Sequence, residues 1–197
     1  MLAIYFSGII CKSTKLLSLL LLFFLISLIP YLFNIYFHGI PGLIEQQVTS
    51  GKVLDIMEMY NCDNLEIFEA IMATFDPVLV AVIIAVESGF KVDAISRAGC
   101  RGLMQLSPDK LEDWRDIHLN IQIGAAYLET QMNYFQDLEL AFAAYNAGPG
   151  AVLKYQGVPP FRETITYLEK IKGFSSYLDH LKLIRPSNGP KIAAALL

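Results

Sequence analysis

The N-terminal part of the sequence is short of charge. No Asp, Glu, Lys or Arg occurs from Leu16 to Ile44, and Leu16–Phe33 is almost entirely apolar. A transmembrane helix requires about 20 apolar residues, so this stretch is long enough to cross a bilayer. The alternative is a cleavable signal peptide, whose apolar core of about 7–15 residues ends in small residues. Ile29–Phe33 offers no such site, so an uncleaved anchor is the favoured interpretation.

Charge next to this stretch predicts its orientation. Lys12 and Lys15 directly precede the apolar run, whereas the opposite flank is uncharged until Glu45. Basic residues stay in the cytoplasm by the positive-inside rule. We therefore expect a single-pass protein whose larger, C-terminal part lies outside the cytoplasm.

Basic clusters and cysteine frameworks are also missing. The 197 residues include 15 Lys and Arg against 19 Asp and Glu, a net charge of −4, which speaks against nucleic acid as a partner. Three cysteines are too few for a disulfide framework; Cys62 and Cys100 could pair in an oxidising compartment, or remain two free thiols. No Cys/His spacing indicates a metal site, and we expect no cofactor.

Alternating apolar and polar residues are absent after Pro77, which favours a mostly α domain. Val78–Val86 is apolar throughout and rich in β-branched residues, a pattern that also fits a buried strand. Asp76 and Pro77 decide between the two, because an N-cap acceptor followed by proline at N1 starts a helix. A helix that is apolar all round belongs in the centre of a domain.

The same reasoning divides the chain into five parts. Residues 1–15 are a cytoplasmic end, 16–37 the anchor, 38–64 a juxtamembrane linker with a short helix beginning near Ser50 or Gly51, 65–172 the main folded domain, and 173–197 a loosely docked tail. We expect an irregular loop with a brief helical turn over Ile95–Pro108, and a break in the helical structure over Asn146–Gly150, where Gly and Pro end a helix. The short helix of the linker is expected over Lys52–Tyr60, and further helices over Asn64–Phe75, Asn120–Tyr134, Leu138–Tyr145 and Glu163–Ile171.

Glu87 is the main candidate for a catalytic residue, because it ends the apolar helix that is predicted to include Val78–Val86. Burial and the negative end of the helix dipole both raise the pKa of a carboxyl group. A protonated Glu near neutral pH can act as a general acid. The alternative is a helix-end Glu that points into water. No downstream carboxylate between Asp93 and Asp116 marks a second catalytic acid, so a mechanism that uses one carboxylate is attractive.

Three short motifs follow Glu87-Ser88 in order: Gly102-Leu103-Met104-Gln105, Tyr145-Asn146, and Glu163-Thr164-x-x-Tyr167. Taken alone, each has a plain structural explanation as a core side chain, a surface amide or a helix C-cap. Together, over Ile67 to Ile171, their order and spacing resemble the SLT (soluble-lytic-transglycosylase-like) lytic transglycosylases. The resemblance implies a lysozyme-like, goose-type/SLT helical domain that cleaves the glycan strands of bacterial peptidoglycan.

The resemblance also implies a mechanism and a set of roles. Glu87 would protonate the glycosidic oxygen between N-acetylmuramic acid and N-acetylglucosamine, and then take the proton of the C6 hydroxyl that closes a 1,6-anhydro ring. Six further residues would bind the substrate or hold the acid: Ser88, Met104, Gln105, Tyr145, Asn146 and Tyr167. In this scheme Met104 lines an apolar wall of the cleft. Cys100 stands where the family often has Ala, which leaves the fine specificity open.

Two other functions remain open at this stage. A goose-type lysozyme would use water in place of the C6 hydroxyl, and a glycan-binding component of an envelope-spanning apparatus would not cleave at all. The predicted anchor and its flanking charges place the protein in the bacterial inner membrane as a single-pass protein, with its catalytic domain on the periplasmic or extracytoplasmic side. Its partners would be the peptidoglycan strand, the membrane and an envelope or secretion machinery.

Overall fold

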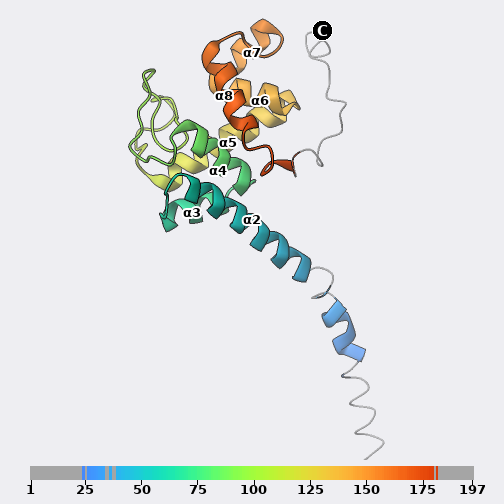
Figure 1. Cartoon of the computed structure of the whole chain (residues 1–197). Helices are drawn as coiled ribbons and strands as arrows, with labels where there is room; N and C mark the ends of the chain where they lie inside the picture. Colours follow the sequence, from blue (N-terminus) through green and yellow to red (C-terminus); the bar gives the residue numbers. More distant parts are fainter. Residues whose placement is uncertain (1–23, 25, 34–35, 37–38, 180, 182–197) are drawn as a thin grey trace, which may run out of the picture. The chain divides into compact units, whose positions relative to one another are not determined.

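The computed structural model describes residues 24, 26–33, 36, 39–179 and 181, and in this part of the chain the regular structure is helical (Figure 1). Pairing between extended segments is limited there to the isolated bridges Ile95–Arg101 and Arg101–Leu106. The prediction of a mostly α domain is confirmed. The helices labelled in Figure 1 are α2 (Ile40–Met59), α3 (Leu65–Met72), α4 (Pro77–Glu87), α5 (Ile117–Phe135), α6 (Leu138–Ala147), α7 (Pro149–Tyr155) and α8 (Arg162–Lys172).

The chain divides by its internal contacts into two units, Met1–Val48 and Thr49–Leu197. The predicted anchor, residues 16–37, lies mostly outside the described residues. Within those residues, none of the helices combines the length and the apolar character that a membrane crossing requires. The predicted cytoplasmic end, residues 1–15, also lies outside them.

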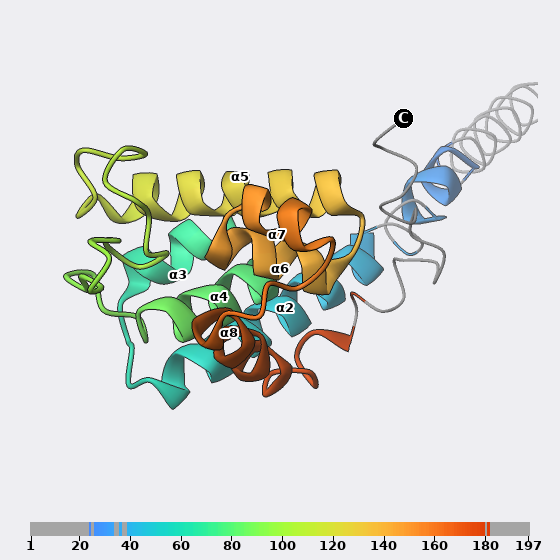
Figure 2. The same cartoon turned by 90° about the horizontal axis from the view of Figure 1, so that it is seen from above.

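Helix α4 forms the centre of the second unit. Its residues from Val78 to Ala85 are all buried, and it packs against α3 and α8 (Figure 2). The Asp76 carboxylate accepts a hydrogen bond from the Leu79 amide at 3.0 Å, and Pro77 occupies the first turn, as the sequence predicts. Asp76 and Pro77 thus begin a helix in a segment that is apolar enough for a strand.

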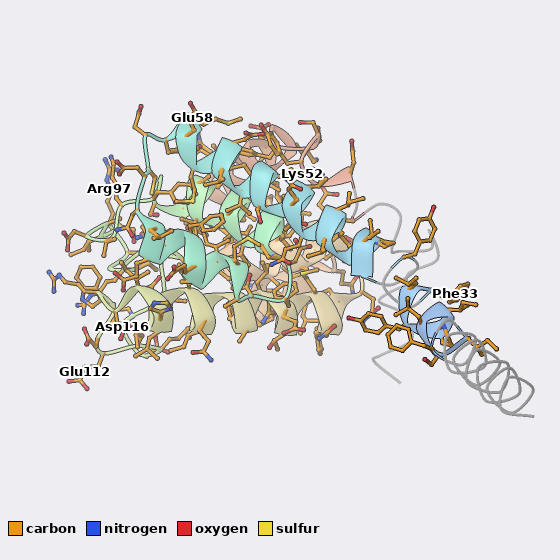
Figure 3. The ribbon with its side chains drawn as sticks, turned by 90° about the horizontal axis from the view of Figure 1, so that it is seen from below. Phe33, Lys52, Glu58, Arg97, Glu112 and Asp116 are labelled. Carbon is orange, nitrogen blue, oxygen red and sulfur yellow. The ribbon has the colours of Figure 1, made fainter. Side chains whose placement is uncertain are left out.

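Helix α2 begins earlier than predicted. It runs without interruption through Ser50 and Gly51, and Val53, Ile56 and Met57 form its buried face. Nothing lies within 4 Å of the position a Gly51 side chain would take, so this glycine is tolerated inside the helix and does not start it. Figure 3 shows Glu58 pointing outward from the same helix.

The C-terminal half of the domain consists of α5 to α8. Aspartates cap α5 and α6: Asp116 accepts from Leu119 and Asp137 from Leu140. The predicted break over Asn146–Gly150 is only partly right. Gly148 ends α6 with a φ of +83°, but Pro149 then occupies N1 of the short helix α7, which the sequence interpretation missed.

The loop between α4 and α5 is held by a buried amide. The Asn120 oxygen accepts from the Met104 amide at 2.9 Å, and its nitrogen donates to the carbonyl oxygens of Trp114 at 3.1 Å and Arg101 at 3.3 Å. A side chain at Gly102 would collide with this amide. The loop contains turns but no helix, and Figure 3 shows Arg97 and Asp116 in this region.

The predicted loose tail is docked where the structure describes it. Leu178 and Leu181 are buried against the core, and the Tyr177 carbonyl accepts a hydrogen bond from Lys52 at 3.5 Å. Residues 182–197 lie outside the described part. The first segment of the tail therefore belongs to the folded domain.

Candidate active site

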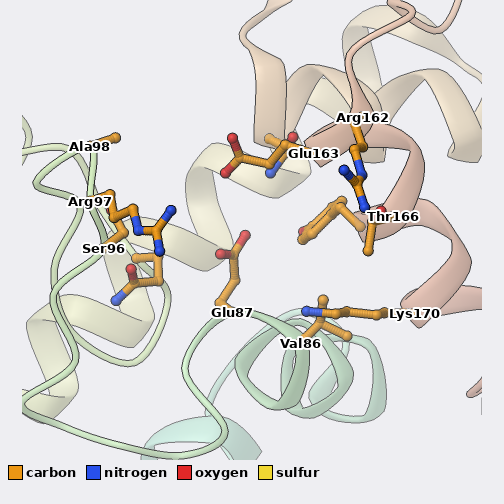
Figure 4. A pocket seen from close by; sticks show the side chains of 12 residues that line it. Val86, Glu87, Ser96, Arg97, Ala98, Arg162, Glu163, Thr166 and Lys170 are labelled. Atoms are coloured by element: carbon orange, nitrogen blue, oxygen red, sulfur yellow. The ribbon is translucent and has the colours of Figure 1, made fainter.

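Two adjoining cavities meet at Glu87. One has a volume of about 760 Å³ and the other about 370 Å³. Six residues line both of them: Glu87, Ser96, Ala98, Gln105, Asn146 and Glu163. The two cavities therefore form one cleft between the α4–α5 loop, the end of α6 and the start of α8. Figure 4 shows the larger cavity, with the Glu87 carboxyl pointing into it.

Glu87 is the side chain of the cleft that is best suited to acid–base chemistry. Protein atoms surround most of its carboxyl group, and this loss of hydration raises the pKa from its usual 4.5 to about 8. The nearby Glu163 carboxylate raises the pKa further, while the Lys170 ammonium opposes the rise. At neutral pH most molecules therefore hold a protonated Glu87 beside open space, which is the state of a general acid before it acts.

Tyr167 lies against Glu87 from α8. Its hydroxyl is buried and completes no hydrogen bond of good geometry with any described residue, yet as a potential donor it lowers the pKa of Glu87. Burial, together with the charge of Glu87, raises the pKa of Tyr167 itself well above 10. Tyr167 therefore stays a donor at all ordinary pH, and a small movement would let it hold the Glu87 carboxylate after proton transfer.

Gln105 faces both cavities but is also tied to its own loop. Its backbone φ is +49°. Its side-chain nitrogen donates to the carbonyl oxygens of Gly102 at 2.9 Å and Ala94 at 3.2 Å. Both amide hydrogens are therefore used to hold the loop, and the side-chain oxygen is the group left to meet a ligand.

Asn146 and Tyr145 end α6 beside the cleft. The Asn146 side-chain oxygen accepts from the Thr164 hydroxyl at 2.9 Å, which leaves its nitrogen as a donor in both cavities. Tyr145 lines only the smaller cavity, and its hydroxyl donates to the Met104 carbonyl at 2.8 Å. Tyr145 thus joins α6 to the loop that carries Gln105.

Two predicted binding residues lie elsewhere. Met104 is fully buried, lines neither cavity and packs closely against Gly124 of α5. The expectation that Met104 forms a wall of the cleft is wrong in this structure, because its side chain turns from the loop into the core. Ser88 caps α4, and its hydroxyl donates to the Ile84 carbonyl at 3.2 Å; Ser88 also lines neither cavity.

The sequence interpretation gave no role in the site to several residues that line the cleft. Glu163 is the second carboxylate of the cleft, and Arg97, Arg162 and Lys170 line its larger half. In the smaller half, the Lys110 ammonium lies 3.9 Å from the centre of the Tyr127 ring. Glu163, Tyr167 and Lys170 are spaced i, i+4 and i+7, so their common face on α8 was readable from the sequence. Arg97 lies in an irregular loop, where no periodicity indicates direction.

The comparison with protein families decides the classification. The family described as "Transglycosylase SLT domain" matches residues 64–168, more than half of the chain. This protein belongs to the transglycosylase SLT family. The matched range of the SLT domain contains every residue predicted for the site, from Glu87 to Tyr167.

Curated relatives of this SLT domain have much longer chains. It is 36% identical over 96 residues to membrane-bound lytic murein transglycosylase F of Desulfosudis oleivorans, covering 43% of this chain and 21% of the relative. It is 29% identical over 123 residues to the soluble lytic murein transglycosylase of Salmonella typhimurium, covering 48% of this chain and 19% of the relative. The chain thus spans about a fifth of each relative's length.

Two solved structures are similar at lower identity. An inactive mutant of lytic transglycosylase Slt from Pseudomonas aeruginosa matches with a TM-score of 0.48 and 24% identity, covering 67% of this chain and 24% of that one. The 70 kDa soluble lytic transglycosylase of Escherichia coli matches with the same TM-score and identity, covering 59% of this chain and 23% of that one.

Proposed function

We propose that this SLT domain is a peptidoglycan lytic transglycosylase that cleaves the β-1,4 bond between N-acetylmuramic acid and N-acetylglucosamine. The observation that carries the proposal is the position of the Glu87 carboxyl group, which lines both cavities at their junction and whose pKa is raised to about 8 by loss of hydration. Cavities on both sides of the acid leave room for sugar units on both sides of the bond that breaks. Membership of the family and the names of the two curated relatives support the same activity.

The raised pKa suits both halves of the reaction. In the first step the bond from C1 of the muramic acid to the leaving oxygen breaks, and that oxygen takes its bonding pair and the Glu87 proton. In the second step the C6 hydroxyl oxygen bonds to C1 and its proton passes to the Glu87 carboxylate. The acid is regenerated, the product is a 1,6-anhydro sugar, and water takes no part. A carboxylate in so poorly hydrated a site is a stronger base than one in water.

The other site residues receive supporting roles. Tyr167 is a candidate to hold the Glu87 carboxylate between the two steps. Asn146 offers a side-chain N–H to an acetamido oxygen, and Gln105 offers its oxygen to a sugar hydroxyl. Tyr145 positions the Gln105 loop through the Met104 carbonyl. Met104 and Ser88, predicted as substrate-binding residues, are proposed here to act through packing and helix termination.

A hydrolase is the second candidate, and Glu163 is the observation that favours it. This carboxylate lines both cavities together with Glu87, and a second carboxylate can activate water in glycosidases. The two reactions leave different ends on the glycan. A lytic transglycosylase gives anhydro ends, whereas a lysozyme gives reducing ends.

The deciding experiment uses mass spectrometry of the sugars released from purified peptidoglycan by the full chain in mild detergent. Anhydro-muropeptides are expected, and reducing-end muropeptides would establish the hydrolase.

The identity of the acid is tested by substitution. Glu87→Gln should fold but cleave about 10²–10⁴-fold more slowly, because an amide cannot donate the proton. Near-native cleavage by Glu87→Gln would contradict the assignment of the acid. Absence of any product from the folded native protein would favour a glycan-binding component.

A membrane anchor in residues 16–37, with the SLT domain in the periplasm, completes the proposal. Ile26, Ile29, Leu32 and Phe33 in this segment are each more than half exposed, which suits contact with lipid better than with water. Fractionation of cells after carbonate washing tests the anchor: a membrane protein stays in the pellet. An envelope or secretion machinery remains the predicted partner.

A further inference from the structure

Three cations line one half of the cleft. Arg97 comes from the α4–α5 loop, and Arg162 and Lys170 come from α8 (Figure 4). All three line the larger cavity and none lines the smaller one. We call Arg97, Arg162 and Lys170 the cationic wall.

The cationic wall carries more positive charge than the carboxylates beside it can balance. None of its three residues makes an ion pair within the described part of the chain, whereas Arg115 pairs with Asp93 at 3.0 Å and Lys172 with Glu139 at 2.9 Å. The carboxylates that line the same cavity are Glu87 and Glu163, and Glu87 is mostly neutral at pH 7. Three positive charges therefore face one negative charge, in a protein whose net charge is −4. Such a local excess of positive charge indicates an anionic ligand.

The glycan chain itself does not explain this excess. N-acetylated sugars carry no charge, so the two sugar rings at the cleavage site need no cation. In peptidoglycan the negative charge lies on the peptide stems that extend from the muramic acid residues, as free carboxylates. A strand bound across Glu87 would bring a stem next to one half of the cleft.

We propose that the cationic wall binds the carboxylates of a peptide stem and so makes the enzyme prefer strands whose stems are negatively charged. This inference rests on the proposed function. Guanidinium groups suit this task, because they bind carboxylates through two parallel hydrogen bonds. The wall would also fix on which side of Glu87 the stem-bearing muramic acid lies.

The size of the preference follows from the exposure of the wall. Arg97, Arg162 and Lys170 are solvent-exposed, and exposed charge pairs contribute little individually, so we expect about a tenfold preference from the set, ~1.4 kcal/mol. Salt should weaken it strongly, because the screening length falls from ~30 Å at 0.01 M to ~3 Å at 1 M.

The test compares one batch of soluble glycan strands before and after conversion of their peptide carboxylates to methylamides, which removes the charge but keeps the peptides. The full chain in detergent is assayed on both strands, and the ratio of the two kcat/KM values is the readout. Arg97→Gln with Arg162→Gln should lower the ratio from about ten to about two. The matched control, Arg115→Gln with Lys154→Gln, removes two positive charges that line neither cavity and should leave the ratio unchanged.

Two further measurements keep the result clear. Arg97→Lys with Arg162→Lys should retain most of the ratio, because the charges remain. Raising the salt should reduce the ratio of the native protein toward one, which tests the wall without any substitution. Two results would overturn the inference: equal kcat/KM values of the native protein on the two strands at low salt, or a fall of the ratio in the control variant as large as in Arg97→Gln with Arg162→Gln. In either case, cleavage of the strands would still uphold the proposed function. If the native protein cleaved neither strand, the proposed function would fail first.

Discussion

Proton affinity at Glu87 links the rate of reaction to the stability of the fold. The same desolvation that raises the pKa of Glu87 to about 8 supplies the acid for catalysis. It also makes the folded state bind a proton that the unfolded chain releases. Each consequence can be measured separately.

The pH dependence of kcat/KM should show the titration of Glu87. Since the acid must carry its proton, activity should fall as pH rises through about 8. We call this fall in activity the alkaline limb of the pH profile. Glu163→Gln removes a neighbouring negative charge and should shift the alkaline limb to lower pH. Tyr167→Phe removes the group that favours the charged form and should shift it to higher pH. Steady-state rates across pH 5–10 on soluble strands check both shifts, and identical limbs in all three proteins would contradict the assignment.

The stability of the fold should depend on pH through the same group. Between pH 4.5 and about 8 the folded state keeps the Glu87 proton and the unfolded state loses it, so the free energy of unfolding falls as pH rises through this window. Glu87→Gln has no such proton. It should therefore exceed the native protein in stability by ~2–4 kcal/mol at pH 8, after allowance for the side of the cleft open to water, and by little at pH 4. Thermal melts at the two pH values test this, and an equal difference at both would count against it.

Among the elements, the contact between α5 and the Gln105 loop controls the shape of the cleft. A side chain at Gly124 would lie 2.5 Å from the Met104 sulfur and 2.7 Å from its Cβ. Met104 directly precedes Gln105 in the chain, and the Tyr145 hydroxyl donates a hydrogen bond to the Met104 carbonyl oxygen. A shift at Met104 is therefore transmitted to both sides of the cleft.

Gly124→Ala should consequently cost ~1–3 kcal/mol of stability and lower kcat/KM. Gly51→Ala is the matched control, because this helical glycine has no atom within 4 Å of the added methyl group; we expect unchanged activity and slightly higher stability. Urea denaturation and strand cleavage measure the two effects. A Gly124→Ala protein as active and stable as the control would show that the loop tolerates the displacement.

The elements also show what a sequence can and cannot predict. Helix α4 was predictable because Asp76 and Pro77 are local signals. Helix α7 was missed because Gly148, Pro149 and Gly150 were taken only as breakers, although proline after a left-handed glycine also begins a helix. Met104 was misplaced and Arg97 was missed for one reason: in a loop, side-chain direction depends on tertiary packing, here on Asn120 and Gly124. Glu87 was found because it is the one charged residue at the end of an otherwise apolar helix.

For the molecule as a whole, the boundary between the two units, Met1–Val48 and Thr49–Leu197, predicts where the chain can be shortened. Removal of Met1–Val48 keeps Val53, Ile56 and Met57, the buried face of α2. Such a protein should remain folded and active without detergent. Removal of Met1–Met59 deletes all three core side chains, at ~2–5 kcal/mol each, which approaches the whole stability of a domain of about 5–15 kcal/mol. Circular dichroism with thermal melting distinguishes the two, and an unfolded product of the shorter deletion would contradict the boundary.

The two hydrogen bonds from the Gln105 amide to its own loop have a consequence for specificity. With its hydrogens committed to Ala94 and Gly102, this glutamine can offer the substrate only an acceptor, so the group opposite must bring the hydrogen. A glutamate at this position would keep that acceptor and still fail, because the loop would lose both internal donors. Tolerance of substitution at Gln105 is therefore limited by the protein's own backbone before any sugar arrives.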